Sequence, residues 1–442
     1  MNKTNIKDVL WRMGIEQLNA MQQDAVAAYR KGQDMVLLSP TGSGKTLAFL
    51  LPLVQSLNEE AAGVQAVVLV PSRELALQID GVFKSMGTSF RAMSCYGGRP
   101  AMEEHRAMNQ LRPHVVIATP GRMNDHLSKG NIDVSSIRTL VIDEFDKCLE
   151  LGFRDEMKQV TGRLPFLERR VLLSATDAEE IPQFVSSRDG YVRLDFLSAE
   201  EQVPDRIRLL CVHSPEKDKL ETLRRLVCTL GEQTSLVFVN YRESVERVGK
   251  YLKQCGVCCE TFHGGMEQKD RERALYKFSN GSCPVFVSTD LAARGLDIPD
   301  IDNIIHYHLP LNEEAYIHRN GRTARWDASG NAYMIFGPEE RKPDYIRLRP
   351  ERFELPAQTP APVRPRWTTL YVGKGKKDKV NKIDIAGYLY KTVGLERDDV
   401  GRIDVKEHYA FVAVRTAVVD RVMRKATNVR IKGVKTLIEE TF

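Results

Sequence analysis

A glycine-rich segment that follows an apolar run constrains the fold of this chain more than any other feature. Residues 39–46 read Ser-Pro-Thr-Gly-Ser-Gly-Lys-Thr, and they lie between the apolar run Met35–Leu38 and a helical stretch. A strand, a glycine turn and a helix N-terminus in this order place backbone N–H groups around phosphate oxygens. Lys45 then supplies a charge for the β- and γ-phosphates, and Thr46 a hydroxyl for Mg²⁺. The segment predicts an α/β domain with a nucleotide site; a flexible turn without a ligand is the alternative.

Short runs rich in Val, Leu or Ile recur through the first 340 residues, and the pattern restarts after about Leu197. Continuous apolar runs are typical of strands buried on both faces of a parallel sheet. The sequence therefore predicts two α/β domains in tandem. The predicted strands are Met35–Leu38, Ala66–Val70, Val115–Ala118, Thr139–Ile142 and Val171–Leu173, then Ser235–Val239, Val285–Ser288, Ile304–Tyr307 and Ala332–Phe336.

A proline-rich stretch separates these domains from a basic tail. Five prolines lie between Arg349 and Trp367, which predicts a semi-stiff linker. From Trp367 onward, 16 Lys and Arg face 10 Asp and Glu, while the rest of the chain is close to neutral. This asymmetry predicts a tail that docks on a polyanion. The predicted domains are residues 1–200, 201–345, the linker 346–366 and the tail 367–442, which reads β-α-β-β-α-β.

The composition argues against membrane and metal-thiolate classes. No apolar run reaches the roughly 18 residues that a membrane helix needs, and residues 1–14 lack a signal-peptide pattern. Cys255, Cys258 and Cys259 are clustered, but only His263 follows as a further ligand, so reduced thiols are preferred over a zinc site. We therefore expect a cytoplasmic protein that does not contact a membrane.

Two further clusters suit phosphoryl transfer. Asp143-Glu144-Phe145-Asp146 follows the predicted strand Thr139–Ile142, where one carboxylate can hold Mg²⁺ and the next can activate water. The alternative is an acidic turn that caps a helix. Residues 316–325 gather three arginines and a histidine in the second domain. Such a cluster is often a solvated face, but opposite a phosphate loop it reads as an arginine-finger loop.

In the motifs described above, the chain resembles the DEAD-box family of RNA helicases in superfamily 2. The resemblance runs in order through both α/β domains and covers about 330 residues. It implies two tandem RecA-like parallel-sheet domains plus a small C-terminal RRM-like α+β domain. The further matching segments are Pro71–Ala76, Gly97–Gly98, Thr119–Arg122, Ser174–Thr176, Val237–Asn240, Gln268–Arg271 and Ser288–Asp297.

The resemblance implies a role for each matching residue, with ATP and Mg²⁺ as cofactors and RNA as partner. Gln22 would read adenine, Asp297 would meet the ribose, and Thr46 and Asp143 would hold the metal. Ser174 and Thr176 would link the ATP site to RNA through contacts with Asp146. The predicted nucleotide-binding residues are Gln22, Ser39, Pro40, Thr41, Gly42, Ser43, Gly44, Lys45, Thr46 and Asp297. The predicted catalytic residues are Lys45, Asp143, Glu144, Ser174, Thr176, His318, Arg322 and Arg325. The predicted RNA-backbone contacts of the core are Arg73, Gly98, Thr119, Arg122, Gly265, Arg271 and Thr289. Because these residues would contact phosphate and ribose, they would discriminate little between RNA sequences.

The chain departs from the family pattern at a few positions. Phe145 replaces an alanine of the acidic motif, so a larger ring must be housed while hydrolysis is expected to persist. Around Gln22, the usual Pro-Thr-Pro is replaced by residues 18–20, and Trp11 is the candidate for stacking on adenine. Asn320 and Ala324 replace an apolar residue and a glycine, which we regard as minor.

The tail resembles, imperfectly, an RNA-recognition motif. Alternation puts Tyr409 and Phe411 on one face and Ala410, Val412 and Val414 on the core face. The aromatics, with Tyr371, are then candidates to stack on bases, and the alternative is that they pack under another element. The basic segment 374–379 follows the first strand and resembles the RNA-binding domain of the DbpA subgroup. Its candidate phosphate contacts are Lys374, Lys376, Lys377 and Lys379; the alternative is a solvated loop.

The function that these features predict is an ATP-dependent RNA helicase, in which ATP and RNA close the two domains. The DbpA-like tail implies a hairpin of 23S rRNA, a role in large-subunit assembly and pre-50S particles as partners. We expect a monomer. Two alternatives stay open: an RNA clamp or assembly scaffold that unwinds little, and a superfamily 2 DNA translocase.

Overall fold

The computed structural model describes residues 5–40, 42–61, 63–98, 101–176, 181–185, 190–197, 207–293, 301–323, 329–426 and 429–441. The chain divides into two compact units. Unit 1 is formed by residues up to Gln202, and unit 2 by Val203–Ala293 with the chain from Ile298 onward. Among the described helices, none combines the length and the apolar character that crossing a bilayer requires.

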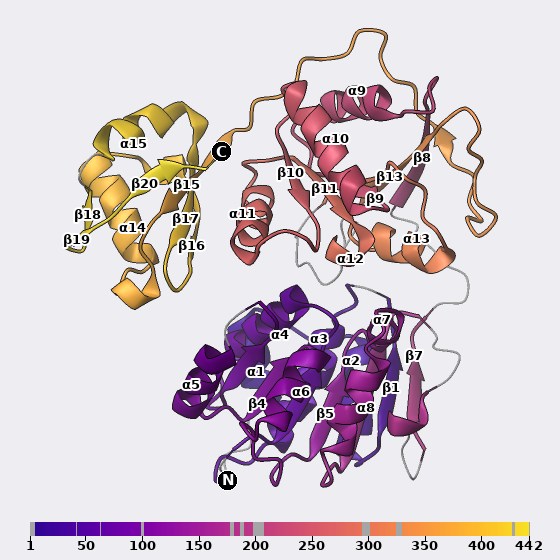
Figure 1. Ribbon diagram of the computed structural model, residues 1–442, viewed down its shortest axis with the longest axis vertical. Helices are drawn as coiled ribbons and strands as arrows, with labels where there is room; N and C mark the ends of the chain where they lie inside the picture. Colours follow the sequence, from indigo (N-terminus) through magenta and orange to yellow (C-terminus); the bar gives the residue numbers. More distant parts are fainter. Residues whose placement is uncertain are drawn as a thin grey trace. The chain divides into compact units, whose positions relative to one another are not determined.

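Unit 1 is built on a seven-stranded sheet in the order β3-β4-β2-β5-β6-β1-β7 (Figure 1). Every strand pair in it is parallel, so the carboxyl ends of its strands share one edge. The strands are β1 (Met35–Leu38), β2 (Ala66–Leu69), β3 (Ala92–Cys95), β4 (Val115–Ala118), β5 (Thr139–Ile142), β6 (Arg169–Ser174) and β7 (Val192–Asp195). The helices are α1 (Ile6–Met13), α2 (Ala20–Arg30), α3 (Lys45–Ser56), α4 (Arg73–Ser85), α5 (Ala101–Leu111), α6 (Pro120–Ser128), α7 (Phe145–Glu150) and α8 (Arg154–Gly162), with a 3₁₀ turn at Gln183–Val185.

The alternation of side chains along these strands divides the core of unit 1 into two layers. Leu37 and Val68 point into a cluster with α1 to α4, whereas Val36 and Val67 point into a cluster with α6, α7 and α8. Because both faces are covered, the strands are apolar at successive positions. Unit 1 is therefore a three-layer α/β domain whose one carboxyl edge is left for ligands.

Unit 2 begins with a second seven-stranded sheet in the order β10-β11-β9-β12-β13-β8-β14, and all its strand pairs are parallel. Its helices pack apolar side chains such as Leu223 and Val248 on the sheet. The strands are β8 (Ile207–His213), β9 (Ser235–Val239), β10 (Cys259–Phe262), β11 (Val285–Thr289), β12 (Asn303–His306), β13 (Gly330–Phe336) and β14 (Glu351–Arg352). The helices are α9 (Leu220–Leu230), α10 (Arg242–Gln254), α11 (Gln268–Ser279), α12 (Asp290–Ala293) and α13 (Glu313–Asn320). Both parallel-sheet domains have the predicted RecA-like architecture.

The tail forms an antiparallel sheet in the order β16-β17-β15-β20, with a separate hairpin of β18 and β19. Its core is aliphatic, as the alternation predicts, with Val412 and Val414 pointing into it. The predicted last strand is divided, because residues 436 and 437 separate β19 from β20. The elements are β15 (Trp367–Val372), α14 (Lys382–Tyr388) continued by a π-helical turn at Leu389–Val393, β16 (Val400–Val405), β17 (Ala410–Arg415), α15 (Val419–Lys425), β18 (Arg430–Ile431), β19 (Val434–Lys435) and β20 (Ile438–Glu440), with 3₁₀ turns at Lys376–Asp378, Arg397–Asp399 and Thr416–Val418.

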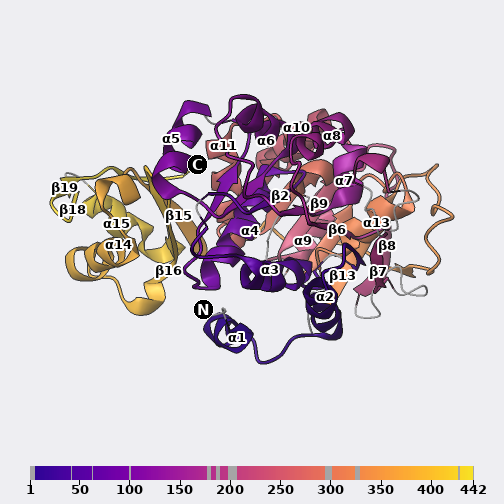
Figure 2. The same ribbon diagram turned by 90° about the horizontal axis from the view of Figure 1, so that it is seen from below.

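Helix α11 of the second parallel-sheet domain packs against the open face of the tail sheet, and both views place these elements next to each other (Figures 1 and 2). Tyr276 stacks on Phe411 with ring centroids 5.1 Å apart, and its hydroxyl donates to the carbonyl oxygen of Phe411 at 3.2 Å. The hydroxyl of Tyr409 donates to Glu272 at 2.6 Å, and Asn280 donates to the Thr369 hydroxyl at 2.9 Å. The tail is thus docked within unit 2.

The proline-rich linker is anchored rather than loose. Phe353 and Leu355 pack against the core of the second domain, and Phe353 donates its backbone N–H to Cys211 at 2.8 Å. The guanidinium of Arg225 on α9 donates to the Pro356 carbonyl oxygen at 2.7 Å and to Thr359 at 3.2 Å. These contacts hold the linker on the domain surface up to at least Thr359.

Candidate nucleotide and RNA sites

The predicted phosphate loop lies between β1 and the N-terminus of α3. Gly42 and Gly44 have φ angles of 84° and 90°, which side chains rarely tolerate. The Ser39 and Ser43 hydroxyls are 2.7 Å apart, and the Lys45 ammonium donates to the Pro40 carbonyl oxygen at 2.9 Å. The loop thus curls around its own lysine, and this is the strand–turn–helix geometry that suits an anion.

Gln22 closes the other side of this loop. It is 4% exposed, and its amide nitrogen donates to the Gly44 carbonyl oxygen at 3.3 Å. A Cβ atom at Gly44 would lie 2.5 Å from that nitrogen, so no other residue fits there without a shift. Asn19 forms a capping box with Gln22 and donates to the Ser43 carbonyl oxygen at 3.0 Å. Sequence reasoning recorded Asn19 only as a departure from the family; its Asn-x-x-Gln spacing is a helix-start signal.

The acidic motif begins at the carboxyl end of β5. In the sheet, β6 lies between β5 and β1, the strand that precedes the phosphate loop. Asp143 is 3% exposed, and burial raises its pKa to about 7; the carboxylates of Glu144 and Asp146 also raise it, while Lys45 opposes the shift. A group of three carboxylates, two of them buried, close to a lysine favours a divalent cation, which would stabilise the ionised form of Asp143. The donor set, with the Thr46 hydroxyl, fits Mg²⁺.

Ser174 ends β6 and Thr176 follows it, and these residues connect the strand to the acidic motif. The Thr176 hydroxyl donates to Asp146 at 2.8 Å, and the Thr176 backbone N–H donates to the Ser174 hydroxyl at 3.1 Å. The carboxyl ends of β5 and β6 are adjacent in the sheet, which explains the close approach. The predicted contact of Thr176 with Asp146 is therefore present.

Phe145, the residue that replaces alanine in the acidic motif, is 2% exposed. It starts α7 and belongs to the buried cluster that includes Ile142, Cys148 and Leu172. The ring is thus housed in the core beneath the motif, not in the site itself. The preceding Glu144 has a φ angle of 50°, so the chain turns sharply before the ring is buried.

The predicted RNA contacts of unit 1 lie at the same carboxyl edge. Arg73 starts α4, and a Cβ atom at Gly98 would lie 2.5 Å from its guanidinium, so these two motif residues are adjacent. Thr119 precedes α6 and donates its backbone N–H to Cys95 at 3.2 Å. Arg122 follows on α6. The four residues come from the ends of β2, β3 and β4, which are neighbours in the sheet.

A buried acidic residue that sequence reasoning missed, Glu104, holds Arg122. Glu104 on α5 is 3% exposed, and one of its oxygens lies 3.0 Å from Arg122 Nε and 3.0 Å from His126 Nε2. Its other oxygen accepts the Tyr96 backbone N–H at 3.3 Å. Since Glu104 already has these three partners, the group it forms with Cys95 and His126 reads as a structural network rather than a metal site. No local pattern in the sequence signals this contact, because α5 and α6 meet only in the fold.

In unit 2, the predicted RNA contacts lie at the β10–β11 end of the sheet. Gly265 donates its backbone N–H to His263 at 3.2 Å, and Thr289 ends β11 and is 9% exposed. Arg271 on α11 is 8% exposed, and its guanidinium lies 4.5 Å from the centre of the Phe262 ring. Other residues of α11, among them Glu272 and Tyr276, contact the tail.

The basic cluster 316–325 falls partly on α13. Arg319, to which sequence reasoning gave no role of its own, is buried and pairs with Asp290 through Nη2 at 2.7 Å. It also donates to Asn240 at 2.8 Å, so it ties three predicted motifs together. His318 lies 3.4 Å from Glu314, and Arg322 is 5% exposed just after the helix. Three predicted site residues, Thr41, Asp297 and Arg325, lie outside the described residues.

In the basic segment of the tail, Gly375 allows a close approach between two backbone segments. A Cβ atom at Gly375 would lie 2.4 Å from the Lys406 carbonyl oxygen, while the backbone N–H of Lys376 donates to that oxygen at 2.9 Å. This close approach fixes a 3₁₀ turn that leaves Lys376 and Lys377 exposed. Lys379 is also exposed, whereas Lys374 pairs with Asp378 at 2.9 Å.

The aromatic face of the tail is not open in this structure. Phe411 is 1% exposed beneath Tyr276, and Tyr409 is bound to Glu272. Lys269 lies 5.0 Å from the centre of the Tyr371 ring. The alternative reading, in which these aromatics pack under another element, is the one that the structure has. Trp11, the candidate for adenine stacking, is 82% exposed on α1.

Comparisons with known proteins agree with this geometry. Residues 19–184 match the DEAD/DEAH box helicase family, residues 218–327 the helicase conserved C-terminal domain and residues 369–440 the DbpA RNA binding domain. The chain is 34% identical to the ATP-dependent RNA helicase DbpA of Escherichia coli, over 95% of this chain and 94% of that protein. It is 29% identical to the DbpA of Bacillus subtilis over the same shares of each chain.

Solved structures of similar proteins include RNA-bound helicases. One is Dbp5 of S. cerevisiae bound to RNA and ADP BeF3, with a TM-score of 0.69 and 26% identity over 80% of this chain and 93% of that one. Another is Mss116p bound to single-stranded RNA and AMP-PNP, with a TM-score of 0.71 and 26% identity over 80% of this chain and 78% of that one. The likeness spans both parallel-sheet domains.

Proposed function

The chain belongs to the DEAD-box family of ATP-dependent RNA helicases and carries a DbpA RNA-binding domain, and from this premise we propose that it remodels a hairpin of 23S rRNA during large-subunit assembly. As a family member it is an RNA-dependent ATPase that binds RNA. The finer target is our inference. It rests chiefly on one observation: the tail presents an exposed basic turn on a glycine-fixed scaffold while its aromatic face is occupied by α11.

We propose that the phosphate loop, Gln22 and the acidic motif form the ATP site of unit 1. The loop N–H groups and Lys45 bind the phosphates, and Gln22 orients adenine through the amide that now contacts Gly44. Thr46 and Asp143 would hold Mg²⁺, which neutralises phosphate charge when bound. Glu144 accepts a proton from the attacking water.

The buried site of Asp143 supports this assignment. Three carboxylates gathered at one strand end are costly without a cation, and Lys45 alone does not prevent the rise in the pKa of Asp143 to about 7. A turn with only a structural role would gain no stability from three carboxylates at this place. A nucleotide–metal site, in contrast, needs it.

In the proposed cycle, ATP and RNA draw the two units together. Arg322 and Arg325 then reach the γ-phosphate and stabilise the charge that develops during transfer. RNA lies along the backbone contacts that begin with Arg73 and Arg122 in unit 1 and Thr289 in unit 2. His318 and Ser174 complete the connection between the two sites. Hydrolysis and phosphate release reset the grip on RNA.

We propose that Lys376, Lys377 and Lys379 bind phosphates of the rRNA hairpin, with Lys374 supporting the turn. The sheet face that would stack bases is covered, so recognition by the docked tail falls to this turn and its surroundings. Stacking by Tyr371, Tyr409 and Phe411 would require the tail to leave α11. The proposed partners are pre-50S particles, and the proposed form is a cytoplasmic monomer.

A matched pair of charge reversals tests the target. Lys376→Glu with Lys379→Glu changes the turn, and Lys391→Glu with Lys425→Glu makes the same charge change at exposed residues of the tail helices. The first pair should weaken binding of a 23S rRNA hairpin at least tenfold more than binding of unstructured RNA; each lost phosphate contact also lowers the salt dependence. Equal loss for both RNAs would mean that the turn is only a general anion contact.

A second candidate function is an RNA clamp that hydrolyses ATP but separates strands poorly. Phe145 keeps it under consideration, because a larger ring underlies the acidic motif that couples hydrolysis to RNA. Strand displacement measured per ATP hydrolysed separates the two: a helicase releases a short strand with few turnovers, whereas a clamp hydrolyses ATP without releasing it.

A further inference from the structure

Unit 2 contains a cavity of about 840 Å³ at the outer edge of its parallel sheet, lined by residues of β8, the end of β13 and the strap that follows. The cavity lies at the β8–β14 end of the strand order, whereas the candidate RNA contacts lie at the β10–β11 end. Neither the ATP site nor the tail uses it. Its size falls within the range of about 300–1,000 Å³ that is usual for small-molecule sites.

The strap, residues 337–350, is fixed over the cavity. Glu340 accepts a hydrogen bond from the buried Lys219 at 2.7 Å and another from the Gly337 backbone N–H at 2.7 Å. Tyr345 donates to the Pro310 carbonyl oxygen, and Ile346 is fully buried. Because these contacts need no ligand, the cavity is preformed.

The cationic side chains that line the cavity outnumber its acids, and one of them, Arg352, pairs with Glu354 at 3.4 Å. Four cationic side chains line it, and they are Arg341, Lys342, Arg349 and Arg352. Its two acids already have cationic partners outside the lining: Glu340 pairs with Lys219, and Glu351 accepts from Arg208 Nε at 3.0 Å. Within the part of the chain that the structure describes, no ion pair is recorded for Arg341 or Arg349. Guanidinium groups placed in this way match phosphate, which they bind through paired hydrogen bonds.

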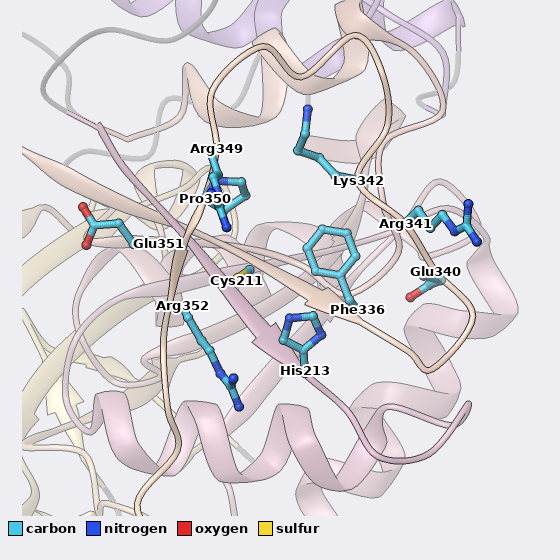
Figure 3. A pocket seen from close by; sticks show the side chains of 10 residues that line it. All are labelled: Cys211, His213, Phe336, Glu340, Arg341, Lys342, Arg349, Pro350, Glu351 and Arg352. Carbon is cyan, nitrogen blue, oxygen red and sulfur yellow. The ribbon is translucent and has the colours of Figure 1, made fainter.

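The floor of the cavity is aromatic. The rings of His213 and Phe336 lie 5.9 Å apart at an interplanar angle of 30°, and Figure 3 shows them at the centre, with Arg349 and Arg352 to their left, Lys342 above them and Arg341 to their right, where its side chain extends away from the rings. Flat rings inside a cationic rim suit a planar base that carries phosphate. An extended peptide fits less well, because β14 already occupies the neighbouring edge of β8 at Leu210 and Cys211.

We propose that this cavity binds a nucleoside phosphate, either free or as one unit of an RNA strand. The base lies against His213 and Phe336, and the phosphate lies in the cationic rim, where it meets Arg349. This site is separate from the ATP site, and it gives unit 2 a nucleotide contact of its own. It would let the second domain sense a nucleotide or hold a flanking strand independently of the phosphate loop.

Cys211 offers a local readout, because it lines the cavity and is 9% exposed. The full-length protein is alkylated with iodoacetamide, and modification of Cys211 is followed by peptide mass spectrometry, with the buried Cys228 on α9 as the internal reference. The probes are CDP, a ten-nucleotide single-stranded RNA and inorganic phosphate. A ligand at twice its Kd should slow modification about threefold by mass action.

Protection of Cys211 by CDP supports a free nucleotide as the source, and protection by the RNA alone supports a unit of RNA. Arg341→Glu with Arg349→Glu should abolish the protection, whereas Lys250→Glu with Lys253→Glu on α10 should preserve it. Unchanged thermal unfolding of both variants ensures that the fold is kept, since all four residues are exposed. Equal modification rates with every probe overturn the proposal. Equal protection by inorganic phosphate overturns it as well, because the aromatic floor would then contribute nothing.

Discussion

The hydroxyl of Thr176 donates a hydrogen bond of 2.8 Å to the carboxylate of Asp146. Thr176 follows β6, and Asp146 lies in the first turn of α7, which follows β5. The bond therefore joins the ends of two neighbouring strands of unit 1. Asp146 belongs to the acidic motif that surrounds the proposed metal, and Thr176 belongs to the segment that the family resemblance connects with RNA. This bond thus joins the acidic motif to the segment that contains Thr176.

Thr176→Ala should therefore separate ATP hydrolysis from strand separation. A hydrogen bond to a charged group contributes roughly 1.5–3 kcal/mol, so unwinding per ATP is expected to fall by about tenfold or more. ATP affinity should change little, because Thr176 does not belong to the phosphate loop. Thr176→Ser keeps the hydroxyl and serves as the control. If unwinding and hydrolysis fell by the same factor, the bond would support the fold of the motif rather than its coupling.

Glu104→Gln should weaken RNA binding through Arg122. The amide keeps the size of the side chain but loses the negative charge that lies 3.0 Å from Arg122 Nε. We expect a several-fold higher RNA concentration for half-maximal ATPase stimulation, with kcat at saturating RNA reduced by less than twofold. Glu103→Gln removes an exposed charge from the adjacent position and is the matched control. An equal effect of both variants would point to overall charge instead of positioning.

The parallel strands with continuous apolar runs were predictable from sequence, and β1, β4, β5 and β9 have the predicted bounds. Strands with polar or sulfur residues escaped the pattern. β3 (Ala92–Cys95) and β7 (Val192–Asp195) lie at the edges of the unit 1 sheet, and β10 (Cys259–Phe262) lies at an edge of the unit 2 sheet. Apolar continuity is a property of central strands, so edge strands cannot be found by it.

The candidate site was predictable where its residues are consecutive. The phosphate loop and the acidic motif carry their chemistry within a few positions, so their spacing was enough. Glu104 and Arg319 act through partners that are distant in sequence, at Arg122 and Asp290, and only packing brings them together. For Phe411, alternation correctly predicted its face, but no local signal could predict that Tyr276 would cover that face.

Loosening the tail from α11 should separate RNA recognition from ATPase stimulation. Tyr276→Ser with Glu272→Lys removes the ring that stacks on Phe411 and the acceptor of the Tyr409 hydroxyl. Fluorophores on α10 and α14 should then report a broader distance distribution. Affinity for the rRNA hairpin should stay within about twofold, since the basic turn is untouched, while hairpin stimulation of the ATPase declines.

Tyr409→Phe is the graded control for this experiment, because it removes only the 2.6 Å bond to Glu272. It should give a smaller loosening, in line with the roughly 1 kcal/mol of one hydrogen bond. Undiminished ATPase stimulation by the hairpin in a demonstrably undocked variant would show that docking has no part in coupling.

Acid should destabilise unit 2 through His306. Burial, together with the positive charge of Arg319, lowers the pKa of His306 to about 3. The folded state therefore keeps this imidazole neutral, while the unfolded chain takes up a proton below its ordinary pKa of 6.5. The free energy of unfolding should fall as pH decreases from about 6.5 towards 3, by up to about 1.4 kcal/mol per pH unit.

Two measurements check this pH dependence. The ring protons of His306 should not titrate by NMR between pH 8 and about pH 5, and hydrogen exchange of the β12 amides should report easier opening at lower pH after correction for intrinsic rates. His308 acts in the same direction, because burial lowers its pKa to about 4. A normal titration of His306 near pH 6.5 would contradict the prediction.

Phe145→Ala restores the residue that the family resemblance leads one to expect, yet it should lower the stability of this protein. The ring is 2% exposed within the cluster under α7, and truncating a buried phenylalanine costs about 3–5 kcal/mol because a cavity remains. We expect a lower midpoint of thermal unfolding and no gain in unwinding per ATP. Phe145→Leu, which fills much of the space, should recover most of the stability. An alanine variant that kept its stability and unwound RNA faster would show instead that the ring restrains the motif, which is the result that the clamp hypothesis requires.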